Sequence, residues 1–396
     1  MTRPRRILPA IALSQFAGTS LWFAINAVMP DLQASAGLPT GAVGWLTAAV
    51  QLGFIAGTLV FALLAVADRF SPRAVFLVSA LAGALLAIAT TLLPPTVDGL
   101  VALRFATGVC LAGIYPVGMK IASGWYAEGL GWALGVLVGA LVLGTALPFA
   151  LRALGAAWPW QGVMATVAAV AAAGGLLMWL AVPDGPHLAR RPHGGGLSPR
   201  ALVVVWTDRR LRASVLGYFG HMWELYAYFV LLPLIVAAHW HGTAAAWWVF
   251  AAIGIGAFSC VGGGLLAQRF GSARVAGSQL ACSGVCCLLS PWLLEAPLWL
   301  WAPWLLLWGA SVSGDSPQFS ALTAANAPRA LVGSVLTLVN SIGFAISVAT
   351  IALFVSLAAV WPLARVLPWL ALGPLVGVLC LRPLLQPRLA TTKARP

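Results

Sequence analysis

Charged side chains are scarce in this sequence. Only 8% of its 396 residues are Asp, Glu, Lys or Arg, whereas a soluble globular domain carries about 25%. Hydrophobic residues make up 61% of the chain. Such a chain lacks the polar side chains that cover a water-exposed surface, so an ordinary soluble domain is excluded. The composition indicates an integral membrane protein.

Residues that bind metals or perform covalent chemistry are also few. The six cysteines all lie within apolar runs, and Cys282, Cys286 and Cys287 share a helix face without a nearby His, Asp or Glu. We therefore expect buried free thiols, no metal site and no cofactor. The loops are too short, and too poor in His, Asp and Glu, to supply the catalytic centre of a lipid-modifying membrane enzyme. We do not expect an enzyme, and that reading is the weakest alternative.

The basic residues are arranged by side of the membrane. The formal net charge is +13, and 19 of the 22 Lys and Arg fall on one side when the apolar runs are read as helices. This asymmetry follows the positive-inside rule and predicts that both termini are cytoplasmic. A nucleic-acid-binding surface would not alternate sides with every second helix, so no nucleic-acid partner is expected. The excess of Arg over Lys and the short loops favour a bacterial inner membrane.

Twelve apolar runs are long enough to cross a bilayer, which takes about 20 residues. One polar stretch, rich in Arg, Pro, Gly and His, separates the first six runs from the last six. The predicted fold is an all-α integral membrane protein with 12 transmembrane helices in two pseudo-symmetric six-helix bundles. The bundles are residues 1–183 and 212–396, and residues 184–211 form a flexible cytoplasmic linker. The predicted spans are 7–29, 41–67, 74–95, 98–119, 129–153, 161–182, 213–236, 244–267, 275–294, 298–321, 330–356 and 361–381.

The two halves repeat short motifs in the same order. Gly113-Ile114-Tyr115-Pro116 corresponds to Gly314-Asp315-Ser316-Pro317, and Trp158-Pro159 corresponds to Trp361-Pro362. The offset between matching motifs changes only from 200 to 203 residues along the chain. This ordered series indicates an internal duplication. It predicts a binding site between the two bundles, near the middle of the bilayer.

A short basic turn also occurs twice, each time between two apolar runs. Residues 68–73 read Asp-Arg-Phe-Ser-Pro-Arg, and residues 268–274 read Gln-Arg-Phe-Gly-Ser-Ala-Arg. These turns resemble the loop between helices 2 and 3 of the major facilitator superfamily, whose pattern is Gly-x-Leu-Ala-Asp-Arg-x-Gly-Arg. Leu64 and Ser71 stand where the two glycines belong in the first copy, and Gln268 replaces the acid in the second. The resemblance implies a cytoplasmic gate formed by Asp68, Arg69, Arg73, Gly264, Arg269 and Gly271.

The resemblance further implies a secondary transporter that moves a small solute by alternating access. Its partners would be a small-molecule solute, protons and the lipid bilayer, and we expect a monomer. Nitrate carriers of the superfamily hold their anion between arginines in helices 2 and 8, but spans 41–67 and 244–267 contain no basic residue. A neutral, cationic or zwitterionic organic solute is therefore favoured. A passive facilitator or a non-transporting sensor is the alternative.

Ionisable residues inside the spans are the candidates for proton coupling, because a charge within hydrocarbon is costly. Glu224 and Asp315 are the two acids well inside predicted helices. The spacing of His221 and Glu224 predicts a shared helix face, and we expect Glu224 to be the principal coupling carboxylate. Asp315 precedes Pro317, which predicts a kink, so it either caps that kink or titrates. Arg104, with a glycine four residues on, resembles the superfamily's helix-4 signature for proton coupling, or is an interfacial arginine.

Polar and aromatic residues on the same helices are candidates for the solute cavity. In the superfamily, helices 1, 4, 7 and 10 line the cavity. Helix 1 offers one face of such residues, and we expect Tyr218 and Tyr228 to share a single face of helix 7 with His221 and Glu224. The residues expected to line the cavity are Gln15, Thr19, Phe23, Asn26, Tyr218, Tyr228 and Asn340.

Overall fold

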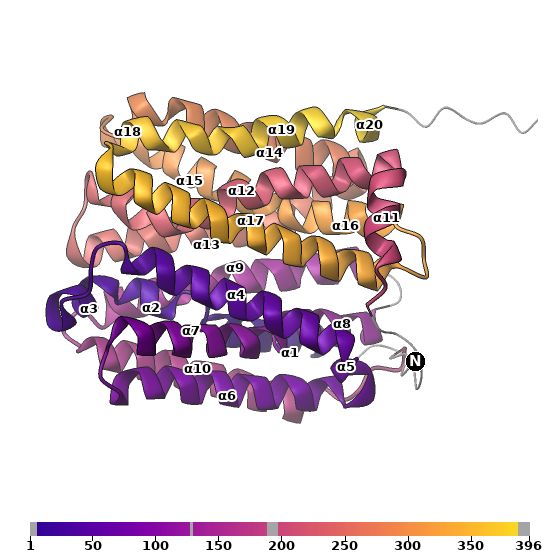
Figure 1. Cartoon of the computed structure of the whole chain (residues 1–396), viewed down its shortest axis with the longest axis horizontal. Helices are drawn as coiled ribbons and strands as arrows, with labels where there is room; N and C mark the ends of the chain where they lie inside the picture. Colours follow the sequence, from indigo (N-terminus) through magenta and orange to yellow (C-terminus); the bar gives the residue numbers. More distant parts are fainter. Residues whose placement is uncertain (1–5, 127–129, 188–196, 387–396) are drawn as a thin grey trace, which may run out of the picture.

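In a computed structural model the structure describes residues 6–126, 130–187 and 197–386, and most of them are helical. The helices form two stacked bundles whose long axes run side by side (Figure 1). The N-terminal bundle contains α1 (Ile7–Thr19), α2 (Ala24–Ala27), α3 (Met29–Ala36), α4 (Ala42–Leu63), α5 (Val66–Arg69), α6 (Pro72–Leu92), α7 (Val97–Ala112), α8 (Tyr115–Trp125), α9 (Leu130–Leu154) and α10 (Trp160–Ala181).

The second half repeats this arrangement after a short helix at the junction. Its first element, α11, lies across the ends of the longer helices (Figure 1). The elements of this half are α11 (Arg200–Thr207), α12 (Arg209–Ala237), α13 (Gly242–Phe270), α14 (Ser272–Leu293), α15 (Leu298–Gly314), α16 (Ser316–Asn326), α17 (Val332–Val360), α18 (Leu363–Val366), η1 (Leu367–Ala371), α19 (Leu372–Cys380) and α20 (Arg382–Leu385).

Ten helices of the described part are long and apolar enough to cross a membrane. The other two predicted spans are interrupted. The first is divided by non-helical residues 20–23, between α1 and α2, and again at Val28, between α2 and α3. The tenth is divided into α15 and α16 at Asp315. The fourth span has a similar break, because α7 ends at Ala112 and α8 begins at Tyr115.

The breaks in the fourth and tenth spans occupy equivalent positions of the duplication. Pro116 and Pro317 lie in the first turn of α8 and α16, where the missing N–H of proline leaves no hydrogen bond unmade. The kink that Pro317 predicts at Asp315 is therefore confirmed. In both halves, the same motif ends one helical segment and begins the next.

A close helix contact also appears in both halves. A Cβ atom added to Gly108 on α7 would lie 2.0 Å from the backbone oxygen of Val50 on α4. A Cβ atom added to Gly309 on α15 would lie 1.9 Å from the backbone oxygen of Ala252 on α13. Only glycine permits these approaches, in which two backbones pack without intervening side chains. The sequence duplication is thus reproduced in three dimensions.

The two bundles meet along two helix pairs, α9 with α13 and α4 with α17. Gly139 of α9 faces α13, since its added Cβ would lie 3.0 Å from the backbone oxygen of Ala257. In the second pair, the buried hydroxyl of Ser347 donates to the Gln51 side-chain oxygen at 2.6 Å. These two helix pairs form the main contact between the bundles.

Parts of the predicted linker are ordered. Residues 183–187 pack on the N-terminal bundle, where the Trp125 indole donates to the Pro183 oxygen at 3.0 Å and the His187 amide to the Gly124 oxygen at 2.9 Å. Residues 200–207 form α11, and α12 begins at Arg209, before the predicted start of the seventh span. The prediction of a flexible linker over 184–211 therefore does not describe these segments, because a short apolar run, 201–206, gives α11 a face to bury.

The two ends of the bundles differ in charge. We call the end that carries α5, α11 and α20 the basic end, and the end that carries α3 and α18 the opposite end (Figure 1). Arg69, Arg73 and Lys120 lie at the basic end with the arginines that flank α11.

Candidate functional site

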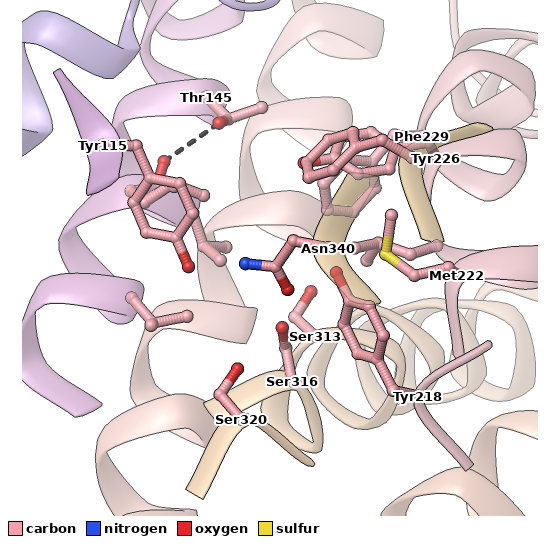
Figure 2. Close-up of a pocket in the computed structure, with 15 residues that line it drawn as sticks. Tyr115, Thr145, Tyr218, Met222, Tyr226, Phe229, Ser313, Ser316, Ser320 and Asn340 are labelled. Carbon is pink, nitrogen blue, oxygen red and sulfur yellow. Dashed lines mark hydrogen bonds between the residues drawn. The ribbon is translucent and has the colours of Figure 1, made fainter. Parts of the chain in front are cut away.

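A small pocket lies between the bundles, near the middle of the spanning helices. Its volume is about 40 Å³, enough for a few water molecules. Hydroxyl, amide and aromatic groups from five spans point into it (Figure 2). None of its lining residues is Asp, Glu, Lys, Arg or His. The labelled lining residues are Tyr115, Thr145, Tyr218, Met222, Tyr226, Phe229, Ser313, Ser316, Ser320 and Asn340.

The repeat explains why helices 4 and 10 contribute to this central pocket. Tyr115 and Ser316 stand at equivalent positions, immediately after the breaks in the two spans, and both line the pocket. The breaks turn the first residue of the following helix toward the axis. The matching motifs around 113–116 and 314–317 are a sequence signal that identifies these two residues.

A larger cavity opens toward the opposite end, and we call it the outer cavity. Its volume is about 750 Å³, and both bundles line it. Asn26, Phe149 and Arg152 belong to its N-terminal wall, and Val230 and Val355 to its C-terminal wall. Ligand pockets have volumes of about 300–1,000 Å³. The outer cavity therefore has room for a small organic molecule.

An aromatic cluster separates the outer cavity from the central pocket. Trp22 and Phe23, from the break in the first span, stack on Tyr226 of α12 with ring centroids 6.0 and 6.3 Å apart. Trp22 also stacks on Phe344 of α17 at 5.6 Å, and Phe23 contacts Phe229 edge-on at 5.9 Å. Side chains of both bundles thus form the contact. These rings therefore form a contact between the two bundles.

Arg104 holds the break in the first span. Its guanidinium group donates to the backbone oxygen of Leu21 at 3.0 Å and to that of Trp22. A helix that stops inside a membrane leaves carbonyl groups without partners, and Arg104 satisfies two of them. The side chain is 3% exposed, so the alternative of an interfacial arginine is wrong.

His221 and Asp315 form a buried pair close to the central pocket. The His221 Nδ1 atom lies 2.8 Å from Asp315 Oδ1, and neither side chain is exposed. The His221 ring also lies 5.8 Å from the ring of Tyr218, which lines the pocket. Asp315 occupies the break in the tenth span, between Ser313 and Ser316, two further lining residues. The pair therefore joins helix 7 to the break in helix 10, immediately behind the pocket wall.

Glu224 lies deeper inside the C-terminal bundle. Its carboxylate accepts hydrogen bonds from the Ser283 hydroxyl at 2.8 Å, the Cys287 thiol at 3.1 Å and the Trp308 indole at 2.6 Å. These donors belong to α14 and α15, and Glu224 does not line the central pocket. Three hydrogen bonds satisfy most of the carboxylate and tie α12 to its neighbours. Sequence reasoning missed all three donors, because their pairing depends on the packing of separate helices.

The prediction that Tyr218, His221, Glu224 and Tyr228 share one face of helix 7 is wrong. At about 100° per residue, Glu224 lies about 120° around the helix from Tyr218. Tyr218 lines the central pocket, whereas the Tyr228 hydroxyl donates to the Leu305 oxygen at 3.4 Å inside the C-terminal bundle. The residues of α12 that face the pocket are Tyr218, Met222, Leu225, Tyr226 and Phe229.

The structure separates the other predicted cavity residues. Asn340 lines the central pocket, and Asn26 lines the outer cavity while it donates to the Thr47 hydroxyl at 2.8 Å. Phe23 belongs to the aromatic cluster between them. Gln15 and Thr19 are fully buried within the N-terminal bundle, where the Thr19 hydroxyl donates to the Gln15 backbone oxygen at 2.8 Å. Neither of these two lines the central pocket or the outer cavity.

The predicted gate residues lie at the basic end. Asp68 pairs with Lys120 of α8 at 2.6 Å, and Lys120 also donates to the Ala67 oxygen at 2.5 Å. Arg73 lies 3.9 Å from Asp184 and stacks over Trp179 at 4.7 Å. These contacts join the turn between the second and third spans to the fourth and sixth spans. Arg69 is exposed at the end of α5.

The second copy of the turn has a different set of contacts. The Arg269 guanidinium lies 5.3 Å from the ring centroid of its neighbour Phe270, and a side chain at Gly264 would meet open space. Gly271 has a φ of +83°, a conformation that glycine adopts without strain. The missing acid at Gln268 thus coincides with the absence of an ion pair equivalent to Asp68–Lys120 among the described residues.

Two six-helix bundles related by duplication, with a polar pocket between them, define a membrane transporter fold. The chain belongs to the Major Facilitator Superfamily, whose family profile matches residues 11–352. A comparison of the sequence with curated proteins gives no match.

Solved structures of the same fold are similar over nearly the whole chain. The human organic anion transporter MFSD10 (TETRAN) has a TM-score of 0.74 and 17% identity, with 95% of this chain and 99% of that chain covered. The proton:xylose symporter XylE, bound to 6-bromo-6-deoxy-D-glucose, has a TM-score of 0.74 and 14% identity, with 96% of each chain covered. The nucleoside transporter NupG, in the form of a point mutant, has a TM-score of 0.71 and 12% identity, with 96% of this chain and 100% of that chain covered.

Proposed function

We propose that this protein is a proton-coupled secondary transporter that moves a small, uncharged organic solute by alternating access. The observation that supports this most is the succession of two cavities between the bundles, separated by the aromatic cluster. A solute from the outer cavity reaches the central pocket when Trp22 and Phe23 move away from Tyr226 and Phe229. The ion pairs of the turn at 68–73 then have to break before the solute is released at the basic end.

The lining of the central pocket supports an uncharged solute. Three tyrosines, three serines and Asn340 supply hydrogen-bonding groups beside aromatic faces. An anionic solute would lose its hydration without gaining a basic side chain there, and burying an unpaired charge is costly. The pocket therefore does not suit an organic anion of the kind that the name of MFSD10 indicates.

The pair His221–Asp315 is the best-placed group for coupling. When the imidazole carries the proton and the carboxyl group is ionised, the pair is an imidazolium and a carboxylate 2.8 Å apart. A second proton, on Asp315, removes the attraction and frees the break between α15 and α16. Ser313 and Ser316 flank this break and line the pocket, so protonation would change the shape of the solute site. Breaking a buried ion pair by loss of one charge costs about 3–5 kcal/mol, enough to shift a two-state equilibrium.

We propose the opposite ranking to the one that the sequence favoured. Glu224, expected to be the principal coupling carboxylate, is satisfied by three donors of its own bundle and does not reach the pocket. We assign it to holding α12 against α14 and α15. Arg104, expected to take part in coupling, is assigned to positioning Trp22 and Phe23 through the break in the first span.

The test uses purified protein in proteoliposomes, with a panel of neutral, cationic, zwitterionic and anionic organic solutes and an imposed pH gradient. Wild-type protein should accumulate a neutral solute only when the gradient is present. Asp315→Asn should abolish accumulation but keep solute exchange, because the amide retains the shape of the carboxyl group and cannot release a proton. Glu224→Gln should keep gradient-driven accumulation. It should lower thermal stability, because the amide accepts only some of the three hydrogen bonds that the carboxylate accepts.

The opposite pattern, with accumulation lost in Glu224→Gln and kept in Asp315→Asn, would return the coupling role to Glu224. Exchange without accumulation in the wild-type protein would make the chain a passive facilitator. Accumulation of an anion alone would contradict the proposed solute class.

We also propose an orientation and an assembly state. The basic end faces the cytoplasm of a bacterial inner membrane, with both termini on that side, and the protein acts as a monomer. The grouping of Arg69, Arg73, Lys120 and the arginines beside α11 at one end supports this orientation. The bundles 1–183 and 212–396 are the two moving units, joined through residues 184–211.

A further inference from the structure

Helix α11 has one face packed on the protein and one apolar face that is exposed. Ala201 and Val205 are buried against the ends of α12 and α17, to which α11 packs. On the other side, Leu202 is 38% exposed, Val203 62% and Trp206 55%. Trp206 follows Leu202 by four residues and Val203 by three, so the three side chains lie on one side of the helix. A contiguous exposed apolar face of this kind is typical of a surface that contacts a membrane or another protein.

The orientation of α11 is fixed by capping contacts at its junction with α12. The Asp208 side chain accepts hydrogen bonds from the backbone N–H groups of Arg210 at 2.9 Å and Leu211 at 2.8 Å, and so begins α12. The Arg212 guanidinium donates to the Trp206 oxygen at 2.7 Å, which ends α11. The chain therefore bends between the two helices. As a result, α11 lies across the ends of the spanning helices at the basic end, parallel to the expected membrane plane (Figure 1).

Basic side chains border the apolar face. Arg200 begins α11, Arg209 begins α12, and both are exposed. The neighbouring arginines are used within the protein, since Arg212 binds the Trp206 oxygen and Arg210 donates to the Pro383 oxygen at 3.2 Å. The carboxylate of Asp208, the acid at the junction, already accepts the hydrogen bonds that cap the N-terminus of α12. An anion that approaches this edge thus meets two outward-facing positive charges.

We propose that α11 is an interfacial helix that binds anionic phospholipids. Leu202, Val203 and Trp206 lie among the acyl chains at the level of the headgroups, and Arg200 and Arg209 contact the phosphates. An apolar face with tryptophan, flanked by arginine, is the composition of helices that lie in the plane of a membrane surface. This lipid contact follows from the location of α11 and is independent of the solute that is transported.

This contact would act on the helices that carry the central pocket. α11 leads directly into α12, which supplies Tyr218 and Tyr226, and the Ser198 amide donates to the Ser334 hydroxyl of α17 at 3.1 Å. Two helices of the C-terminal bundle are thus attached to one surface helix. Lipid bound to α11 holds their ends at a fixed depth while the bundles move.

The experiment places a bimane fluorophore at Val203→Cys in the full-length protein, reconstituted in phosphatidylcholine vesicles with or without phosphatidylglycerol. Brominated lipids report contact with acyl chains, and aqueous iodide reports contact with water. A matched label at Pro186→Cys, an exposed position on the segment that packs on the N-terminal bundle, serves as the water-exposed control. Identically labelled wild-type protein gives the background from the six native cysteines.

The Val203→Cys label should be quenched by brominated lipid and protected from iodide, with the reverse at Pro186→Cys. Brominated phosphatidylglycerol should quench more effectively than brominated phosphatidylcholine, by roughly fivefold in apparent affinity for each arginine. In the background of Arg200→Gln and Arg209→Gln, this preference should disappear while quenching by lipid remains. Iodide quenching at 203 equal to that at 186 would overturn the proposal and leave the face for a protein partner. An unchanged lipid preference in the double variant would overturn the role of the arginines.

Discussion

Arg104 is the residue on which the shape of the first span depends. Its two donors satisfy the carbonyl groups of Leu21 and Trp22, in the segment where the helix is interrupted. A buried cation normally destabilises a protein unless it is paired. Here two backbone carbonyl groups of the non-helical segment 20–23 supply the partners. The cost of burying the guanidinium group is thus offset by two carbonyl groups that would otherwise lack hydrogen bonds in the membrane.

Replacing Arg104 should therefore destabilise the fold more than replacing an exposed arginine. Arg104→Gln removes two charge-assisted hydrogen bonds, which are worth about 1.5–3 kcal/mol each. We expect a clear loss of thermal stability for the purified protein in detergent, together with reduced transport. The matched control is Arg365→Gln, because Arg365 is exposed and stacks at 5.9 Å from the Trp361 ring. Equal thermal stability of the two variants would contradict the positioning role of Arg104.

At the scale of the element, the glycines of helix α9 lie in different surroundings, either packed inside a bundle, at the interface between the bundles or in open space. Gly144 packs inside its own bundle, because an added Cβ would lie 2.2 Å from the Phe16 oxygen of α1. Gly139 faces α13 across the bundle interface at 3.0 Å from the Ala257 oxygen, whereas Gly131 faces open space. The glycines of one helix thus have three different surroundings.

We expect Gly139→Val to reduce transport and Gly131→Val to leave it near the wild-type level. A valine at 139 would push α9 away from α13 or block their relative motion, while the same side chain at 131 meets no neighbouring atom. Proteoliposome uptake measures the effect, and membrane insertion and size-exclusion profiles show whether each variant folds. Similar uptake by both variants would show that the α9–α13 contact has no part in the transport cycle.

The sequence predicted elements well where the signal was local. Pro317 predicted the break of the tenth span, and apolar length predicted the spans themselves. Pro116 carries the same signal for the break of the fourth span, which was not predicted. The break at 20–23 has no such signal, since Leu21, Trp22 and Phe23 continue an apolar run and the interruption depends on Arg104 from another helix. The same limit applies to Glu224 and Asp315. Their presence inside helices was visible, but which one faces the pocket depends on how α12 is rotated against α14, α15 and α16.

At the scale of the whole molecule, the two ends differ in charge, and this predicts the orientation in the membrane. Reporter fusions after Asp68, Asp184 and Arg269 should give cytoplasmic signals, and fusions near Ala36 and Gly242 should give external signals. The structure places Ala36 and Gly242 at the end toward which the outer cavity opens. A cytoplasmic signal near Gly242 would contradict both the orientation and the division into six plus six spans.

The mouth of the outer cavity carries one strong ion pair. Arg152 binds Asp31 through two hydrogen bonds of 2.9 Å each, and these are the two Asp, Glu, Lys or Arg residues among those that line the cavity. Because their charges cancel, the mouth produces little electrostatic field at a distance. A solute should therefore arrive by unsteered diffusion, without the long-range attraction that accelerates capture by charged funnels.

Unsteered capture predicts an uptake rate that depends little on ionic strength. Between 0.01 and 0.15 M ionic strength the Debye length falls from about 30 Å to about 8 Å, yet the initial uptake rate at low solute concentration should change by less than about twofold. Asp31→Asn leaves the charge of Arg152 without its partner at the mouth. In that variant the capture of a negatively charged competitor should become sensitive to ionic strength, while the capture of a neutral solute should not.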